Sequence, residues 1–322
     1  VPAMAAAASL MFALGAHAAS QQGPVSLVVP YPAGGGSDIT ARIVAPALAR
    51  QLGATVVVEN VGGATGAIAV QKVLSAAADG HLLYQGSQNE LIIPPLTVKS
   101  VPFGPADLEI VHPITTTRLV LVVRRDLPAK TLDEFIALTR QTKGAEPLSY
   151  GSPGVGSLYH LVAEHMAQLS GGRYTHVPYK GAAPMMQDLI GGRLDFTVMA
   201  FSTGMLAAEK AGQYRIIANM SKDKPEQLAG LPSISEAELF KTVDYASNAA
   251  YYVKKGTPSA IRLELNRALG QALSSADVTS ALEADGRRVP KAMSVAQAEA
   301  FYQAEIDKYR RVVADTGFKP AE

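Results

Sequence analysis

The chain alternates short apolar runs with longer segments in which apolar residues recur every three or four positions. The short runs are rich in Val, Leu and Ile, as in buried strands, whereas the longer spacing is typical of amphipathic helices. This pattern predicts strands at 26–29, 55–58, 81–84, 119–123, 148–150, 175–177, 196–199 and 215–218. It predicts helices at 38–52, 66–77, 131–143, 158–170 and 184–190, and an almost wholly helical tail over 259–316. Such alternation predicts an α/β fold with mainly parallel sheets flanked by helices.

Two predicted strand-to-helix junctions are rich in glycine and hydroxyl residues. The first runs from Pro30 through Gly34-Gly35-Gly36 to Ser37 and Asp38, and the second from Tyr150 to Ser157. Glycines let a ligand approach the backbone, and the free N–H groups of a first helical turn attract anions. Each junction alone is equally well explained as an ordinary tight turn. If the two face each other across a cleft, they favour an anion site.

The N-terminal segment resembles a targeting sequence. Residues 3–15 form a small-residue apolar run that is followed by Ala16-His17-Ala18, a typical cleavage pattern. The alternative is a buried N-terminal helix, because no Lys or Arg precedes Arg42 to form the usual basic start. We expect residues 1–18 to be a signal peptide and the protein to be periplasmic. No cysteine is present to carry a lipid anchor.

The composition and net charge exclude several classes of function. Of the 322 residues, 48% are hydrophobic, which is enough to build a full core, and the net charge is only +1. A nucleic-acid partner is therefore not expected, because phosphate contacts need clustered Lys and Arg. The absence of cysteine excludes disulfides, thiolate nucleophiles and Cys-bound metals.

Motifs for enzymes, metals and cofactors are not fulfilled. Ile39 stands where a dinucleotide fingerprint needs its third glycine, and Tyr150 stands where a nucleophile elbow around Ser152 needs a glycine. His160 and His165 are five residues apart and so lie on different faces of the predicted helix. We therefore predict no catalytic residue, no metal and no cofactor, and a capping or hinge-lining role for His160.

Several segments together resemble a known family. They are Val29 to Asp38 with Ala41-Arg42, Val58-Glu59-Asn60, Tyr150 to Ser152 with Gly156-Ser157 and His160-Leu161, His176 to Gly181 with Pro184, Gly191 to Asp195, and Lys255 to Pro258. In order and spacing they resemble the Bug family, the TctC-like substrate-binding proteins of tripartite tricarboxylate transporters. The resemblance covers the chain after the predicted signal peptide.

The resemblance implies a two-lobed periplasmic-binding-protein fold of type II. Lobe 1 would comprise residues 24–123 and 247–322, and lobe 2 residues 124–246. Short polar stretches at 124–128 and 244–248 are candidate crossing points between the lobes. The implied function is capture of a small organic carboxylate by a monomer that delivers it to membrane permease subunits. The alternative is a ligand-loaded partner of a membrane receptor kinase.

The resemblance also implies a ligand-binding set, which we carry over by position. Lobe 1 would supply Tyr31, Ala33, Gly34, Gly35, Ser37, Asp38, Gly86, Ser87 and Gln88. Lobe 2 would supply Ser152, Gly156, Ser157, His160, Met199 and Ala200. Lys180 lies within a shared motif and is interpreted as structural.

One departure from the family concerns the far end of the ligand. Many relatives carry an Asp-Asn pair where this chain has Met199-Ala200. Because the motif loops contain neither Lys nor Arg, backbone amides would have to hold the carboxylate. An apolar wall formed by Met199, Ala200 and Phe201 would favour an acid with an apolar body over an amino acid. Alternatively, Met199 points into the core.

Overall fold

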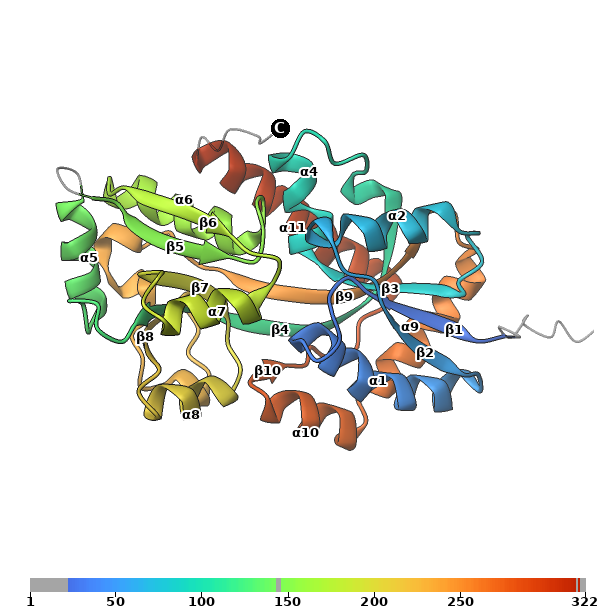
Figure 1. Ribbon diagram of the computed structural model, residues 1–322. Helices are drawn as coiled ribbons and strands as arrows, with labels where there is room; N and C mark the ends of the chain where they lie inside the picture. Colours follow the sequence, from blue (N-terminus) through green and yellow to red (C-terminus); the bar gives the residue numbers. More distant parts are fainter. Residues whose placement is uncertain (1–22, 143–145, 317, 319–322) are drawn as a thin grey trace, which may run out of the picture.

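The computed structural model describes residues 23–142, 146–316 and 318. The predicted signal peptide, residues 1–18, lies outside the described part. Figure 1 shows two groups of strands and helices side by side, joined by the long strands β4 (Leu108–Arg124) and β9 (Ala246–Lys254). Within the described ranges, no helix has the length and apolar character needed to cross a membrane. The α/β class predicted from the sequence is confirmed.

The first group is built around three parallel strands. Strand β1 (Val25–Val29) pairs in parallel with β2 (Val56–Asn60) and with β3 (Leu82–Ser87). β9 pairs antiparallel with both β3 and β4, and the two-residue strand β10 (Arg287–Arg288) adds to β4. The helices of this group are α1 (Gly36–Leu52), α2 (Ala67–Ser75), α3 (Gln88–Leu91), α4 (Ile93–Thr97), α9 (Ser259–Leu273), α10 (Ala276–Ala284) and α11 (Val295–Thr316).

The second group repeats this plan on a smaller scale. Strand β5 (Leu148–Ser152) pairs in parallel with β6 (Tyr174–Pro178) and β7 (Phe196–Ala200), while β7 and β8 (Tyr214–Asn219) run antiparallel to β4. Its helices are α5 (Leu132–Gln141), α6 (Leu158–Ser170), α7 (Ala182–Ile190) and α8 (Gly204–Lys210). Short 3₁₀ turns lie at Ala64–Gly66, Pro105–Asp107, Glu226–Leu228, Ile234–Glu236 and Glu238–Phe240. Parallel pairing is thus confined to strands joined by helices, and the shared strands β4 and β9 make each sheet region mixed.

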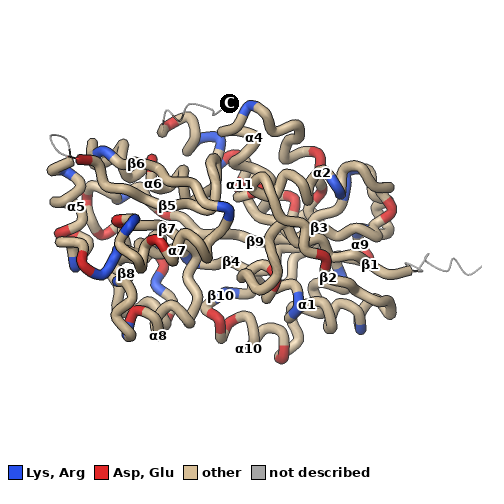
Figure 2. The backbone as a smooth tube through the Cα atoms, in the orientation of Figure 1, with Lys and Arg blue, Asp and Glu red and all other residues tan. Residues whose placement is uncertain are grey.

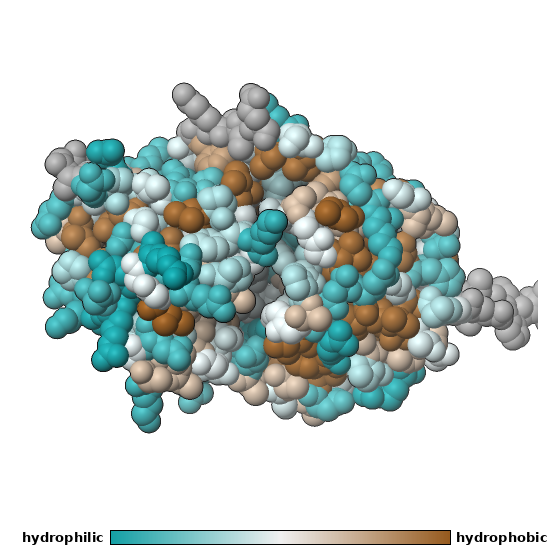
Figure 3. All heavy atoms as spheres, viewed as in Figure 1, coloured by the Kyte–Doolittle hydropathy of each residue, from teal (hydrophilic) through white to brown (hydrophobic). Residues whose placement is uncertain are grey.

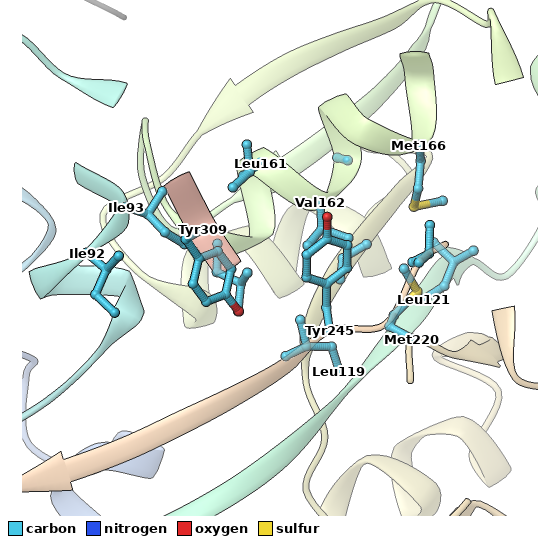
Figure 4. Close-up of a cluster of buried hydrophobic side chains, with 14 of the residues drawn as sticks. Ile92, Ile93, Leu119, Leu121, Leu161, Val162, Met166, Met220, Tyr245 and Tyr309 are labelled. Carbon is cyan, nitrogen blue, oxygen red and sulfur yellow. The ribbon is translucent and has the colours of Figure 1, made fainter. Parts of the chain in front are cut away.

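A shared apolar core joins the two groups. Leu119 and Leu121 on β4 contribute to the same cluster as Leu161 and Val162 on α6 and Tyr309 on α11. Figure 4 shows these side chains converging, with Ile92 and Ile93 approaching from the α3–α4 region. Because these residues are almost fully buried, the two groups are continuous on this side. Any opening between them must therefore occur elsewhere.

Candidate ligand-binding site

A cavity of about 560 Å³ lies between the two groups of elements. Figure 3 shows the surface hollowed at this position. From the first group the lining residues are Tyr31, Pro32, Ala33, Gly34, Gly35, Gly36, Ser37, Thr40, Gln85, Gly86, Ser87, Asn89, Glu90, Thr115, Thr117, Ser247, Ala249 and Arg287. From the second they are Pro153, Tyr159, Lys180, Gly181, Ala182, Ala183, Pro184, Met185, Met199, Ala200, Phe201 and Ser202. Nine of the fifteen residues predicted to bind ligand line this cavity.

The loop between β1 and α1 forms one wall. Gly34 has a φ of +83°, a conformation suited to glycine, and its N–H donates to Asp38 Oδ2 over 2.9 Å. α1 begins at Gly36, so the N–H groups of its first turn have no partner within the helix. These amides, with the positive end of the helix dipole, favour an anion beside Gly36 and Ser37.

Asp38 supports this loop and does not line the cavity. Its carboxylate is buried and accepts hydrogen bonds from the Gly34 N–H and from Arg42 Nε at 3.0 Å. The hydrogen bond from Arg42 is the main cause that lowers the pKa of Asp38. An ionised Asp38 therefore fixes the loop conformation from behind.

The end of β3 forms a second part of the same wall. Gln85, Gly86, Ser87 and Glu90 line the cavity, whereas Gln88 points away from it. Gln88 Nε2 donates to the carbonyl of Ala246 over 2.7 Å, and its Oε1 accepts from the Asn248 N–H at 3.1 Å. Gln88 thus ties α3 to the beginning of β9, and the ligand-binding role predicted for it has no support from its position.

The second glycine-rich junction lies beside the cavity. Only Pro153 and Tyr159 of this region line it, and the predicted residues Ser152, Gly156, Ser157 and His160 do not. Ser157 caps α6 by accepting from the His160 N–H, and Gly156 packs against Thr97 of the first group. The Leu158 N–H donates to Asn89 Oδ1 over 2.9 Å, so this loop bridges the two groups.

His160 belongs to a buried aromatic stack. Its ring centroid lies 3.9 Å from that of His176 at an interplanar angle of 12°, and the ring of Tyr150 stacks against His176 at 4.9 Å. His160 Nδ1 accepts from the Gly156 N–H, and His176 Nε2 lies 2.7 Å from Ser152 Oγ. Burial lowers the pKa of His160 to about 3 and that of His176 to about 4. Both imidazoles are therefore neutral at pH 7, and the predicted capping role of His160 agrees with this arrangement.

Two basic residues on the cavity wall were absent from the predicted set. Lys180 precedes α7 and is exposed, and Arg287 reaches the cavity from β10. Arg287 pairs with Asp285 and donates through Nη2 to the Gly36 carbonyl over 3.1 Å. Figure 2 marks the basic and acidic positions along the backbone, with the two arginines of β10 in blue. The cavity wall therefore carries two cations in addition to the backbone amides that were expected to face a ligand carboxylate. Arg287 was missed because β10 is two residues long and is distant in sequence from every glycine-rich loop.

No group of three or more His, Cys, Asp or Glu side chains in the described ranges is placed to hold a metal ion. The cavity instead combines first-turn amides and two cations with an apolar wall. Met199, Ala200 and Phe201 supply that wall at the end of β7. Such a site suits a small acid.

Comparisons with known proteins identify the family of this chain. Residues 40–318 match the family described as the tripartite tricarboxylate transporter family receptor, TctC. A UPF0065 protein of Agrobacterium vitis, from the TAR-I ttuE-ttuC' intergenic region, is 33% identical over 301 residues, covering 91% of this chain and 84% of the relative.

Solved structures show the same fold. An R. palustris protein with adipate has a TM-score of 0.84 and 30% identity, covering 94% of this chain and 99% of that protein. MatC from Rhodopseudomonas palustris, with bound malate, has a TM-score of 0.82 and 26% identity, covering 91% and 99%. The chain belongs to the TctC family of tripartite tricarboxylate transporter receptors, which are solute-binding proteins and not enzymes.

Proposed function

We propose that this solute-binding protein captures a small organic carboxylate in the cavity between β1–α1, β3 and α7. The observation that carries the proposal is Arg287, which lines the cavity and donates to the carbonyl of Gly36 at the start of α1. A guanidinium beside free first-turn amides is a strong anion site. The adipate and malate of the related structures support an organic acid as the ligand.

The proposed contact set differs from the one carried over by position. We propose that Tyr31, Ala33, Gly34, Gly35, Ser37, Gly86, Ser87, Met199 and Ala200 contact the ligand together with Lys180 and Arg287. Asp38, Gln88, Ser152, Gly156, Ser157 and His160 would act from behind the wall, by fixing the loops that carry these contacts. We also propose that residues 24–123 with 247–322 and residues 124–246 are two lobes that close on the ligand.

Membership of the family supports a transport role. We propose that the protein acts in the periplasm and delivers its ligand to the membrane permease subunits of a tripartite transporter. Co-purification of those subunits with the ligand-loaded protein, and their loss without ligand, would test the delivery step.

Calorimetry on Arg287→Met tests the capture step. A charge-assisted hydrogen bond contributes about 1.5–3 kcal/mol, so the variant should bind the best acid of a dicarboxylate screen at least about tenfold more weakly. Arg288→Met is the matched control, because Arg288 is the exposed neighbour and does not line the cavity. Equal affinity in the two variants, or no stabilisation of the wild type by any carboxylate, would contradict the proposal.

A further inference from the structure

Glu90 is a buried carboxyl group on the wall of the cavity. Only 2% of the residue is exposed, and its side chain is held in one place. Oε2 accepts from the Ser87 N–H over 2.6 Å and from Ser87 Oγ over 2.9 Å, and the Tyr31 hydroxyl donates to Oε1. Gly66, at a φ of +86°, leaves the room that Glu90 occupies, because a Cβ there would lie 2.6 Å from Glu90 Cγ.

The charge of Glu90 has no partner of opposite sign. Three donors point at the carboxylate, but no ion pair joins it to a basic residue in the described part of the chain. A buried carboxylate without a cation is unfavourable, and burial accordingly raises the pKa of Glu90. Oε1 accepts a single hydrogen bond, so it retains a lone pair for a further donor.

Gln85 presents a second acceptor on the same wall. Residues 85 and 87 point to one face of β3, because side chains alternate along a strand. Gln85 Nε2 donates to the Ser37 carbonyl over 2.7 Å, which fixes the orientation of the amide. Its Oε1 is buried and has no hydrogen-bond partner among the described residues. A buried acceptor without a donor is unfavourable by about 1–3 kcal/mol, and a ligand donor would remove that cost.

These two acceptors indicate what the far end of the ligand carries. We propose that the bound acid bears an ammonium group that donates to Glu90 and Gln85, while its carboxylate faces Arg287 and the start of α1. This proposal rests on the proposed function, because the carboxylate end uses the site described there. It replaces the preference for an apolar body that Met199 and Ala200 had predicted, since those residues line a different wall and Glu90 comes from α3.

Two sets of acids separate the ammonium group from every other feature of the ligand. Adipate, 5-aminopentanoate, 5-hydroxypentanoate and hexanoate share a six-atom chain and differ only in the terminal group. Succinate, malate and aspartate differ only in a hydrogen, a hydroxyl or an ammonium on one carbon. By calorimetry, the ammonium member of at least one set should bind wild type about tenfold more tightly than the others, as a charge-assisted hydrogen bond allows.

Substitutions at Glu90 and Gln85 test whether these two acceptors cause the preference for an ammonium group. Glu90→Gln should remove the tenfold preference and strengthen the binding of adipate or succinate, and Gln85→Met should weaken the preference independently. Glu238→Gln, which changes net charge equally at an exposed site, should leave it intact. Thermal unfolding of each variant verifies folding, and the Gln85 variant keeps the test decisive if Glu90→Gln does not fold.

The calorimetry distinguishes a failure of this inference from a failure of the proposed function. If wild type binds the dicarboxylates most tightly, or if both variants keep the ammonium preference, this inference is wrong and carboxylate capture stands. If no acid binds, the proposed function itself fails.

Discussion

At the residue scale, the glycine at the end of β3 is constrained by its neighbour. A Cβ on Gly86 would lie 2.2 Å from Cε1 of Tyr84, whose ring is fully buried and cannot move away. We expect Gly86→Ala to reduce the free energy of unfolding by about 1–3 kcal/mol, as overpacked cores do. Gly230→Ala is the control, because nothing lies within 4 Å of its Cβ position, and it should change stability by less than about 0.5 kcal/mol. Denaturant unfolding that gives equal values for the two variants would refute this account.

The stacked histidines make stability depend on pH in one direction. The folded pKa values of about 3 and about 4 lie below the ordinary value of 6.5, so the unfolded chain binds protons first as pH falls. The stabilisation is complete above pH 6.5 and is lost as pH falls from there towards 4. Each imidazole adds about 1.4 kcal/mol per pH unit to the slope within this window.

Replacement of one ring should flatten that slope. His176→Gln can keep a contact to Ser152 but removes one titrating group, so its unfolding free energy should change less between pH 6.5 and 4.5 than that of the wild type. Chemical unfolding at a series of pH values measures the effect. A steeper slope in His176→Gln would show that another group governs the acid sensitivity.

At the scale of elements, β4 is the strand on which both sheet regions depend. Leu119, Leu121 and Val123 face one core cluster, whereas Val120 and Val122 face another. Leu121→Ala should therefore destabilise the protein by about 2–5 kcal/mol. Leu263→Ala on α9 makes the same chemical change at a residue that is 58% exposed, and it should have an effect below about 0.5 kcal/mol. If Leu121→Ala loses only a little stability, the strand relaxes around the cavity that the substitution leaves, and this account of β4 is wrong.

The same strand shows what local pattern could and could not predict. The run 119–123 was recognised because both of its faces are buried, and the helix predicted at 131–143 is found as α5, which begins at a capping box of Thr131 and Glu134. The first part of β4 was missed, because His112, Pro113 and four consecutive polar residues interrupt the apolar pattern where register shifts occur. β9 was not predicted for a similar reason, since its first residues are half-buried and partly polar, and the stretch 244–248 was interpreted as a candidate crossing point.

Only part of the site could be predicted from the sequence, and the reason is physical. Residues on contiguous glycine-rich loops, such as Gly34 and Gly35, could be found because the backbone conformation itself leaves a sequence signal. Glu90 and Arg287 could not, because their positions depend on pairing between elements that are far apart in the chain. A single charged residue also looks the same in sequence whether it faces solvent or a cavity.

At the scale of the whole molecule, the two groups share a core and also meet through buried polar contacts. The shared core of β4, α6 and α11 is continuous, and buried polar contacts between the groups lie beside it. They include the Leu158 N–H to Asn89 Oδ1 bond at 2.9 Å and the Thr97 hydroxyl, 3.5 Å from the Gly156 carbonyl. A closing movement of the two groups would have to form these contacts.

Gly156 offers a way to disturb these contacts without touching the ligand. A Cβ there would lie 2.6 Å from Thr97 Oγ1 and 2.9 Å from Val98 Cγ2, across the interface. Gly156→Ala should therefore disfavour the closed arrangement and weaken the best-binding acid by about tenfold, which corresponds to a population shift of about 1.4 kcal/mol. Small-angle scattering should show that ligand reduces the radius of gyration of wild type more than that of the variant.

Gly192→Ala provides a matched control for backbone strain. Both glycines have a φ of +74°, but nothing lies within 4 Å of the Cβ position at Gly192, which follows α7 on the surface. The left-handed conformation should cost both variants about 1–2 kcal/mol of stability, and only Gly156→Ala adds a steric clash. They should differ in affinity, because only Gly156 lies where the two groups meet. If both variants bind the acid equally well, and ligand compacts both to the same extent as wild type, these contacts are not part of closure and the cavity binds its ligand without movement of the two groups.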